Sequence, residues 1–481
     1  PCRRVGAGEL CIVKSTVPTR GSRKTRGKPR HDVEHQMTAA PCLARLSFQR
    51  VRRYRNTVAS STRSAVRLVA VVSCTAMASA SVTPPSPPAR LDAVIIGGGI
   101  SGLTAASKLH EACISVALVE ARPRLGGRCF STPEGVDLGA SWAWLPDERD
   151  VNAAANARGL SWVPQRLEGG VRMEGGRRAP SGGEMLAPCG PGAVRMEGGY
   201  GALADALAST LPEGSIRLGA GVEKIEKSDD PNDPGIIVRL DSNSGGASSP
   251  PLLARRVIVA VPPRVIASSL AFQPALPDAR TARMRGTQTW AGDWCKAVAT
   301  FSKPFWRDNK DSGVAQWGRG SGALLAVSWE AAHVELGEAG YALAGVNFGK
   351  GACERLDAFG ASDPVTGKSP DGTRDAIKAE LAKVFGADVI NEHLLEVYHK
   401  AWITDGLTWD EGDGGALNSG ADPRSAYGHE LLRKPTEWGV HFAGTETEPR
   451  YGHVDGAVAA GERAASEVLA ALAADKKKDE L

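Results

Sequence analysis

Three glycines at fixed spacing open a segment whose residue types can bind a dinucleotide. Residues 97–102 have the pattern G-x-G-x-x-G, directly after an apolar run of strand length and before residues of helical periodicity. Gly97 permits a tight turn, Gly99 lets the backbone approach a pyrophosphate, and Gly102 lets the helix pack close to the strand. The helix N-terminus, which holds Ser101, then faces the phosphate charge.

One acidic residue stands where a ribose-binding carboxylate is expected. A second apolar run, residues 115–119, ends at Glu120, and its spacing from Gly102 is close to that of a βαβ unit of about 30 residues. The carboxylate would accept hydrogen bonds from a ribose hydroxyl and would repel a 2′-phosphate, which disfavours NADP. We therefore predict a Rossmann-type dinucleotide-binding unit over residues 91–128.

The residues that follow this acid favour FAD over NAD. Residues 120–128 have the sequence E-A-R-P-R-L-G-G-R, which closely resembles the E-A-R-x-R-x-G-G-R run of the flavin amine oxidase superfamily. That superfamily includes monoamine and polyamine oxidases, and the resemblance implies that the run wraps the FAD pyrophosphate and ribose. The chemistry agrees, because glycines allow close approach and guanidinium groups offer paired donors to phosphate oxygens. The residues concerned are Arg122, Gly127 and Arg128.

Further blocks of resemblance extend to about residue 470. They imply that residues 137–142 pass beside the flavin, that residues 198–203 return the chain to the cofactor domain, and that the backbone of Val222 meets the adenine. The block that starts at His441 is similar, almost residue for residue, to the last strand and helix of monoamine oxidases. The cofactor contacts implied by these blocks are Gly139, Ala140, Ser141, Trp142, Val222, Gly444, Glu446 and Val454.

Two features of the resemblance concern catalysis. A helix that starts near Asp455 would direct its positive end at flavin N1 and O2, where charge accumulates on reduction. The run from Trp290 to Lys296 resembles the strand that presents a lysine, through water, to flavin N5, and we assign that role to Lys296. A lysine inside a strand is costly to bury unless it is solvated or bonded, which favours a functional use. The alternative is a solvent-facing lysine on the other face of the strand.

The substrate side departs from the monoamine oxidase pattern. Ala416 stands where the cysteine that attaches FAD is expected, so we predict noncovalent FAD. Leu417 and His453 stand in place of the two tyrosines that flank the substrate, and Tyr451 can replace part of the missing aromatic wall. Arylalkylamine specificity therefore does not carry over. The predicted substrate cavity comprises Trp402, Leu417, Tyr451 and His453, with a position in the core as the alternative for Trp402.

The positions of these motifs define the elements that must bring them together. We predict an α/β fold, with a Rossmann-type FAD-binding domain and an interleaved α+β substrate domain. The substrate domain is shorter than in typical relatives, because only about 55 residues separate Trp142 from Gly198. The FAD-binding domain is assigned to residues 91–145, 198–289 and 431–470, the substrate domain to residues 146–197 and 290–430, and the flanks to a leader at 1–90 and a charged tail at 471–481.

Both flanks carry targeting patterns. Residues 1–36 precede the first Met and are excluded from the fold prediction as upstream sequence. Residues 37–90 contain no acidic residue, and in them arginines precede an apolar run at 68–74 and an A-x-A cleavage pattern at 78–80. This layout fits a secretory signal, and nearly as well an organellar transit peptide, before a Pro-rich linker. The K-D-E-L sequence at 478–481 favours the endoplasmic reticulum lumen, with a plastid or other organelle as the alternative.

Composition excludes several classes of protein. The chain is 42% hydrophobic and 23% charged, as in ordinary globular proteins, and it has no apolar run of about twenty residues that would predict a transmembrane segment. The net charge of +4 comes from the leader, where 17 Lys and Arg face 3 Asp and Glu, so the remainder has no basic footprint for nucleic acid.

The sequence predicts no metal site, because no His/Cys cluster has metal-ligand spacing. Five cysteines beyond the leader show no disulfide spacing and are expected to be mostly buried free thiols.

Together these features predict an FAD-dependent amine oxidase. Hydride would pass from the carbon that bears a neutral amine to flavin N5, water would hydrolyse the imine, and dioxygen would reoxidise the flavin to give hydrogen peroxide. The substrate would be a primary amine, a polyamine or an amino acid, and the sequence decides neither this nor the oligomeric state. Two alternatives remain: a flavin-dependent desaturase or porphyrinogen-type oxidase, and an inactive FAD-bound scaffold, which the missing tyrosine pair and the shortened substrate domain motivate.

Overall fold

The computed structural model describes residues 90–230, 234–241, 250–318, 322–332, 340–410, 426–449 and 452–479. All of them belong to the second of two compact units into which the chain divides, residues 83–481. Within these described ranges the strands form one sheet of eight strands, one of seven strands and a two-stranded ribbon.

The eight-stranded sheet has a parallel core built from segments that lie far apart in the sequence. Its strands are β1 (Leu91–Ile96), β2 (Val116–Val119), β7 (Ile216–Arg217), β8 (Val222–Lys227), β9 (Ile236–Leu240), β10 (Leu252–Val259), β11 (Ala271–Gln273) and β17 (Val440–Phe442). They lie in the order β11-β8-β9-β10-β1-β2-β7, with β17 paired to β10. Strand β1 pairs in parallel with both β2 and β10, and β17 pairs in parallel with β10.

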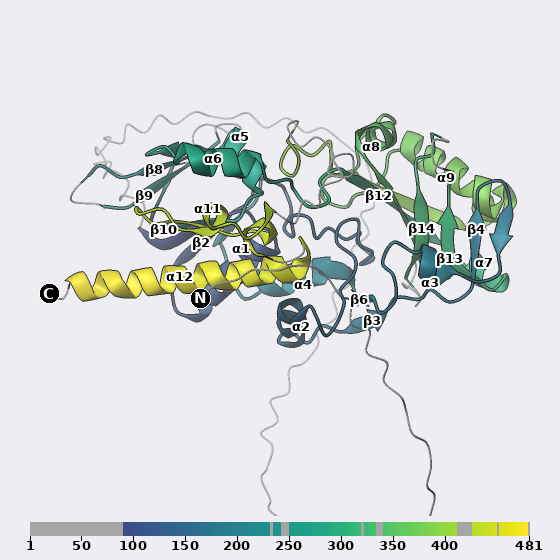
Figure 1. Ribbon diagram of the computed structural model, residues 1–481, viewed down its shortest axis with the longest axis horizontal. Helices are drawn as coiled ribbons and strands as arrows, with labels where there is room; N and C mark the ends of the chain where they lie inside the picture. Colours follow the sequence, from purple (N-terminus) through teal and green to yellow (C-terminus); the bar gives the residue numbers. More distant parts are fainter. Residues whose placement is uncertain are drawn as a thin grey trace, which may run out of the picture. The chain divides into compact units, whose positions relative to one another are not determined.

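Alternate residues of β1 point into two hydrophobic cores. Ala93 and Ile95 pack with helices α1 (Ile100–Glu111), α4 (Gly199–Ala208) and α12 (Val454–Asp479). Val94 and Ile96 pack with residues of β8 to β10 and of helices α5 (Pro263–Ser269) and α6 (Asp278–Arg285). Burial on both faces explains the continuous apolar run of this strand, as is typical of parallel sheets. In Figure 1, α12 runs along one side of the sheet while α5 and α6 lie on the other.

The seven-stranded sheet forms the second part of the unit. Its strands are β4 (Gly170–Met173), β5 (Arg177–Ala179), β12 (Trp294–Phe301), β13 (Asp311–Gln316), β14 (Val327–Ala332), β15 (Tyr341–Phe348) and β16 (Leu394–Ala401), in the order β16-β12-β15-β14-β13-β4-β5. Neighbours in this order are antiparallel except for β13 and β4. Helices α8 (Lys350–Asp357), α9 (Asp371–Phe385) and α10 (Ala387–His393) pack on one face, where Figure 1 shows α8 and α9.

Strand β12 directs one cysteine toward these helices. Cys295 forms a disulfide with Cys353 of α8, with a distance of 5.3 Å between their Cα atoms. The prediction of free thiols is therefore wrong for these two residues, because 58 positions separate them and only the packing of α8 on β12 brings them together. Cys129 and Cys189 are buried and free, as predicted, whereas Cys113 is free and exposed.

The predicted α/β fold class is confirmed. The apolar run at 91–96 is strand β1, the segment after the glycine loop is helix α1, and the run at 115–119 contains β2. The domain limits drawn from the sequence stay predictions, and the segment 170–179 contributes its two strands to the seven-stranded sheet. The other elements are α2 (Arg149–Asn156), α3 (Gly183–Leu186), α7 (Phe305–Asp308), α11 (Glu430–Arg433), η4 (Thr445–Thr447), and the paired strands β3 (Trp162–Pro164) and β6 (Val194–Met196).

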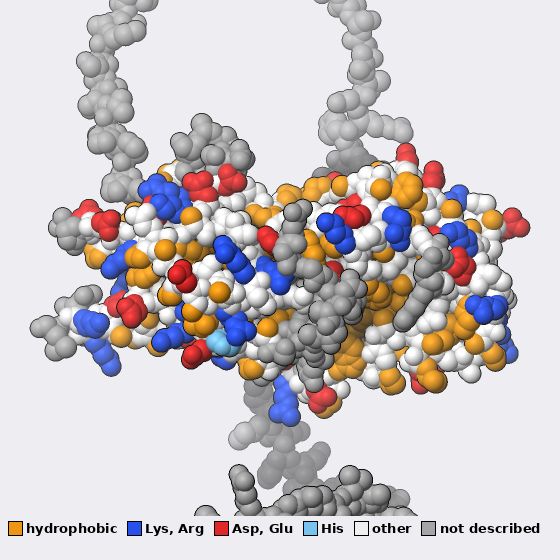
Figure 2. All heavy atoms as spheres, turned by 45° about the horizontal axis from the view of Figure 1, so that its top comes forward, with side chains coloured by type: hydrophobic (Ala, Val, Ile, Leu, Met, Phe, Trp, Pro, Cys, Tyr) orange, Lys and Arg blue, Asp and Glu red, His pale blue; other side chains and the backbone are white. Residues whose placement is uncertain are grey.

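The surface and the chain ends bear on the remaining sequence predictions. On the face shown in Figure 2, Lys and Arg side chains are interspersed with Asp and Glu. Among the described residues, no helix is long and apolar enough to cross a membrane, and no cluster of His, Cys, Asp or Glu could hold a metal ion. Helix α12 carries three lysines in its last turn, whereas residues 1–89 and 480–481 lie outside the described ranges. The targeting predictions therefore stay predictions.

Candidate active site

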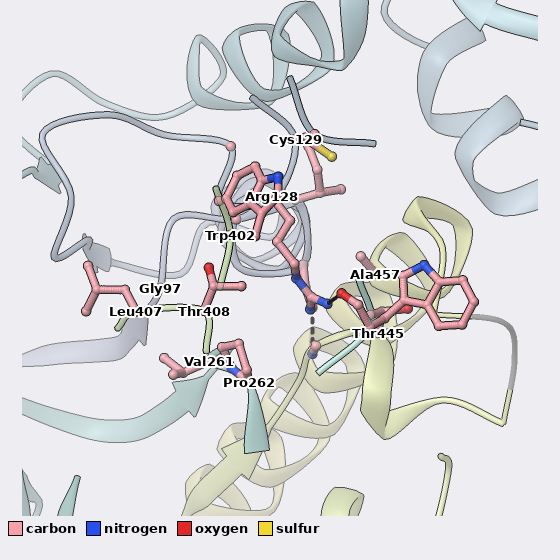
Figure 3. Close-up of a pocket in the computed structure, with 18 of the residues that line it drawn as sticks. Gly97, Arg128, Cys129, Val261, Pro262, Trp402, Leu407, Thr408, Thr445 and Ala457 are labelled. Atoms are coloured by element: carbon pink, nitrogen blue, oxygen red, sulfur yellow. Dashed lines mark hydrogen bonds between the residues drawn. The ribbon is translucent and has the colours of Figure 1, made fainter. Parts of the chain in front are cut away.

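A cavity of about 710 Å³ is lined by both large sheets and by the segments that connect them. Figure 3 shows the side chain of Arg128 reaching through this cavity toward the segment that holds Thr445. Every predicted cofactor residue except Gly102 lines the cavity, as do three further predicted residues, Lys296, Trp402 and His453. Leu417 and Tyr451 lie outside the described residues, and so does Ala416, the position on which the prediction of noncovalent FAD rests.

The glycine loop is shaped by close backbone contacts. Gly97 has a φ of +103°, and a Cβ there would lie 2.6 Å from the carbonyl oxygen of Ala260. A Cβ on Gly102 would lie only 1.9 Å from the carbonyl oxygen of Gly97, which leaves no room for a side chain. A Cβ on Gly99 would meet nothing closer than 3.9 Å, so space beside this residue is open to a ligand. Ser101 Oγ accepts a hydrogen bond from the Gly444 N–H at 3.0 Å, which ties α1 to the segment after β17.

Glu120 lies at the end of β2 and holds the loop by its carboxylate. Its two oxygens accept hydrogen bonds from the N–H groups of Gly98, at 2.6 Å, and Arg122, at 2.8 Å. The residue is only 4% exposed and lines the cavity. A buried carboxylate at this place favours hydroxyl donors from a ribose and disfavours an added phosphate.

The three arginines of the 120–128 run bind protein groups. Arg122 pairs with Asp405 at 2.9 Å, and the charges of Arg122 and Lys400 outweigh burial and hold the pKa of Asp405 at about 2. The Arg124 guanidinium lies 3.7 Å from the centre of the Phe130 ring and donates to two backbone carbonyls of its own loop. Burial lowers the pKa of Arg124 to about 10. The donors of Arg124 therefore face the loop that it supports.

Arg128 and Glu446 form a two-point ion pair at the cavity. Arg128 Nη1 lies 2.7 Å from Glu446 Oε1, and Nη2 donates to Oε2 at 3.0 Å. Glu446 is fully buried, and Arg128 also donates to the carbonyl oxygen of Trp290. These contacts join the 120–128 run, the segment before β12 and η4 in one corner of the cavity.

Lys296 is buried, so the alternative of a solvent-facing lysine is wrong. Its Nζ donates to the carbonyl oxygen of Gly139 at 2.9 Å and to the hydroxyl of Ser141, and it is 5% exposed. The rings of Trp142 and Trp329 lie 5.8 and 5.2 Å from the ammonium group. Burial lowers the pKa of Lys296 to about 8, against the opposing charge of nearby Asp137. The ammonium is thus bonded within the segment that the resemblance placed beside the flavin.

Trp402 is both a core residue and a cavity residue. It is 4% exposed, packs with the core on the cavity side of the seven-stranded sheet, and lines the cavity. Its Nε1 donates to the carbonyl oxygen of Leu138 at 3.2 Å. The two interpretations weighed for this residue therefore do not exclude each other.

His453 belongs to an aromatic wall that the sequence did not reveal. Its ring lies stacked on Trp144, with centroids 5.2 Å apart, and edge-on to Trp290 at 5.6 Å. Its Nδ1 lies 2.5 Å from Oε1 of Glu148. Trp144 could have been suspected from the sequence, because it follows the predicted flavin neighbour Trp142 by two positions. Nothing in the sequence indicated Glu148, which lies 305 positions from His453.

Comparisons with known proteins agree with this geometry. Residues 95–157 match the family described as "NAD(P)-binding Rossmann-like domain", and residues 157–469 match "Flavin containing amine oxidoreductase". The chain is 29% identical over 345 residues to the putative flavin-containing monoamine oxidase AofH of Mycobacterium tuberculosis. The alignment covers 68% of this chain and 65% of that protein. Over 69 residues the chain is 39% identical to human amine oxidase [flavin-containing] B, which covers 14% of this chain and 13% of that protein.

Solved structures share the fold. A putrescine oxidase bound to putrescine superposes with a TM-score of 0.60 at 21% identity, covering 80% of this chain and all of that one. Cyclohexylamine oxidase from Brevibacterium oxydans superposes with a TM-score of 0.59 at 20% identity and the same coverage. The alignment with the mycobacterial protein spans just under two thirds of that relative's length. Because the match to this family over residues 157–469 spans well over half of the chain, the chain belongs to the flavin-containing amine oxidoreductase family.

Proposed function

We propose that the chain is an FAD-dependent oxidase that acts on amines. When bound, FAD would accept a hydride from the carbon that bears the amine and pass the electrons to dioxygen, which gives hydrogen peroxide. The observation that carries the proposal is the buried Lys296, whose ammonium is bonded within the cavity that starts at the dinucleotide loop. A lysine is rarely retained in such a place without a functional use.

The residues present fit FAD. The open space beside Gly99 and the tight packing at Gly97 and Gly102 suit a pyrophosphate, and the Glu120 carboxylate suits an adenosine ribose. The glycine loop and Lys296 line the same cavity. The residues proposed to hold the cofactor are Gly97, Gly99, Ser101, Glu120, Arg122, Gly127, Arg128, Gly139, Ala140, Ser141, Trp142, Val222, Gly444, Glu446 and Val454.

The cysteines of the cavity support noncovalent binding. Among the described residues that line it, the cysteines are Cys129 and Cys295. Burial raises the pKa of the Cys129 thiol well above its usual range, so it is not a nucleophilic thiolate, and Cys295 is bonded to Cys353. Acid precipitation should therefore release all of the yellow colour into the supernatant, and colour that stays with the protein would contradict noncovalent binding.

Lys296 is proposed to serve the oxidative half of the reaction. With a pKa of about 8, its Nζ is mostly cationic at neutral pH, in a place that excludes bulk water. A fixed positive charge in such surroundings stabilises negative charge that develops as dioxygen is reduced. Its bonds to Gly139 and Ser141 hold the ammonium in one position.

The aromatic wall supports activity over an inactive scaffold. The scaffold alternative rests on the missing tyrosine pair and on the shortened substrate domain. Against the first of these grounds, Trp144 and Trp290 place two indoles against His453 at the cavity. Indole faces provide the apolar, electron-rich surface that suits an amine-bearing carbon chain. A desaturase or porphyrinogen-type oxidase is the remaining alternative, and it does not require an amine.

An anaerobic substrate panel tests the proposal. Primary amines including cyclohexylamine, the diamine putrescine and several amino acids are mixed with the flavin-loaded protein, and the flavin absorption band is followed. At least one amine should bleach the band, and air should restore it with release of hydrogen peroxide. Dithionite, which reduces flavin directly, is the control for a competent cofactor. If dithionite bleaches the band and no amine or amino acid does, the chain is not an amine oxidase.

Residence in the endoplasmic reticulum lumen is also a proposal. It rests on the K-D-E-L sequence at 478–481, and the disulfide between Cys295 and Cys353 supports an oxidising compartment. Deleting the four residues should send the protein into the medium. An unchanged plastid or cytosolic distribution would contradict this location.

A further inference from the structure

Glu148 fixes which nitrogen of His453 carries a proton. The distance of 2.5 Å between His453 Nδ1 and Glu148 Oε1 is that of a hydrogen bond, and an ionised carboxylate can only accept one. Nδ1 therefore donates, and in the neutral ring the lone pair lies on Nε2. The Glu148 side chain is 9% exposed and that of His453 is 23% exposed, so the carboxylate lies behind a ring that reaches the cavity.

Two helices hold this pair in place by contacts in both directions. Glu148 immediately precedes α2, and its Oε2 accepts a hydrogen bond from the Trp144 N–H. In return, Asp455 in the first turn of α12 accepts hydrogen bonds from the first-turn N–H groups of α2, those of Asp150 at 2.7 Å and Val151 at 3.0 Å. His453 itself lies immediately before α12, between the rings of Trp144 and Trp290. Such contacts orient the imidazole as a supporting shell orients a catalytic group.

The proposed reaction needs a proton acceptor at this place. Aliphatic amines reach the protein at neutral pH mainly as ammonium ions, and hydride leaves the adjacent carbon only when the nitrogen lone pair is available. Lys296 is a poor acceptor below about pH 8, because its Nζ is itself protonated there and donates to Gly139 and Ser141. The acidic groups packed near His453 are engaged as well, Asp455 with α2 and Glu446 with Arg128.

We propose that His453, oriented by Glu148, accepts the proton of the substrate ammonium. This rests on the proposed function as an amine oxidase. An N–H bond of the ammonium breaks with its electron pair left on the amine nitrogen, and the proton bonds to Nε2. The imidazolium is stabilised by the Glu148 carboxylate and returns the proton to water after the product leaves. The substrate class is thereby narrowed to amines that bind as ammonium ions and become neutral within the cavity.

The pH dependence of anaerobic flavin reduction separates this role from a structural one. His453→Phe keeps a flat ring between the two indoles and removes both nitrogens. At about pH 7 it should reduce the flavin about 100-fold more slowly than the wild type, the usual contribution of a general base. The deficit should shrink toward the pKa of the amine, because the amine then arrives neutral. A deficit that stays constant with pH would mean that His453 only shapes the cavity and would overturn the proposal.

Binding of an amine that cannot be oxidised gives a second readout without turnover. An amine with no hydrogen on the adjacent carbon, such as α,α-dimethylbenzylamine, is titrated at several pH values. Quenching of tryptophan fluorescence, to which Trp144 and Trp290 at the cavity contribute, reports binding. Affinity for the His453→Phe variant should fall about tenfold for each pH unit below the pKa of the amine, because only the neutral form binds. Affinity for the wild type should fall less steeply. If the affinity of the wild type and of the variant for the amine fell equally steeply with pH, the proposal would be contradicted.

Two further variants complete the experiment. Glu148→Gln keeps the size of the side chain and should slow flavin reduction in the same pH-dependent manner as His453→Phe, but less. The matched control is Glu467→Gln, which removes the negative charge from the carboxylate–imidazole contact between Glu467 of α12 and His441, at 3.1 Å and away from the cavity lining. It should behave as the wild type. If no amine reduces the wild-type flavin, the proposed function fails, whereas the binding slopes still decide the role of His453.

Discussion

The two ends of the cavity are held in different ways. At the dinucleotide end the important contacts belong to the backbone: Gly97 and Gly102 pack against carbonyl groups, and Glu120 accepts from two N–H groups. At the end where the amine is proposed to bind, called the amine end below, they belong to ionisable side chains, Lys296 and the His453–Glu148 pair. Backbone contacts leave little freedom in residue type, whereas side-chain contacts can be exchanged for others of similar chemistry. The first end therefore suits a common cofactor and the second a particular substrate.

The corner where both ends meet should be the most sensitive to change. Arg128→Met would leave the fully buried Glu446 carboxylate without its charged partner, and breaking a buried ion pair costs about 3–5 kcal/mol. Urea unfolding should show this loss of stability, and adding Glu446→Gln to the variant should recover much of it. The control is Arg239→Met, at an exposed pair with Glu226 that is worth less than about 1 kcal/mol. Equal effects of the two arginine variants would contradict the account of this corner.

Lys296 should give the amine end a pH-dependent stability. Its pKa is lowered from 10.5 to about 8, so between these values the unfolded chain binds a proton that the folded chain does not. Stability should therefore rise with pH over that window, by about 3 kcal/mol relative to Lys296→Met. Denaturant unfolding of both proteins at about pH 7.5 and 10 measures the difference. A difference that is the same at both pH values would show that the ammonium is not desolvated.

At the dinucleotide end, substitution of Gly102 and of Gly99 should have different effects on stability and on flavin binding. Gly102→Ala places a Cβ 1.9 Å from a backbone oxygen, so it should cost about 1–3 kcal/mol and release the flavin. Gly99→Ala has open space and a φ of −74°, so the fold should keep its stability while flavin affinity falls. Thermal unfolding of the apoprotein and flavin titration separate the two effects. Wild-type stability of Gly102→Ala would contradict the packing described for α1.

The same contrast explains what the sequence could predict. The strand at 91–96 and the role of Gly97 follow from local pattern, because their contacts are set within one βαβ unit. Lys296 was identified only through family resemblance, and strand alternation alone left both faces open to it. The fold decides which face it takes, since the Cys295 side chain is bonded to Cys353 of α8, whereas the side chain of its neighbour Lys296 donates to Gly139 and Ser141.

Contacts across long stretches of chain could not be predicted. Glu148 meets His453 only because α2 packs on α12, and Cys295 meets Cys353 only because α8 packs on β12. The contacts of Arg124 depend on the fold in the same way. A guanidinium can bind a phosphate or stack on an aromatic ring, and the place of Phe130 selects the ring.

Separate measurement of the two half-reactions tests the central claim, oxidation of an amine by FAD beside Lys296, most directly. With Lys296→Met and an amine that reduces the wild-type flavin, anaerobic reduction should persist, and reoxidation by air should slow about 10- to 1000-fold, or about 1.4–4 kcal/mol. Lys303→Met, at an exposed lysine paired with Asp308, is the control and should reoxidise at the wild-type rate. Wild-type reoxidation of Lys296→Met, with only amine binding changed, would place Lys296 in the substrate cavity and contradict the account.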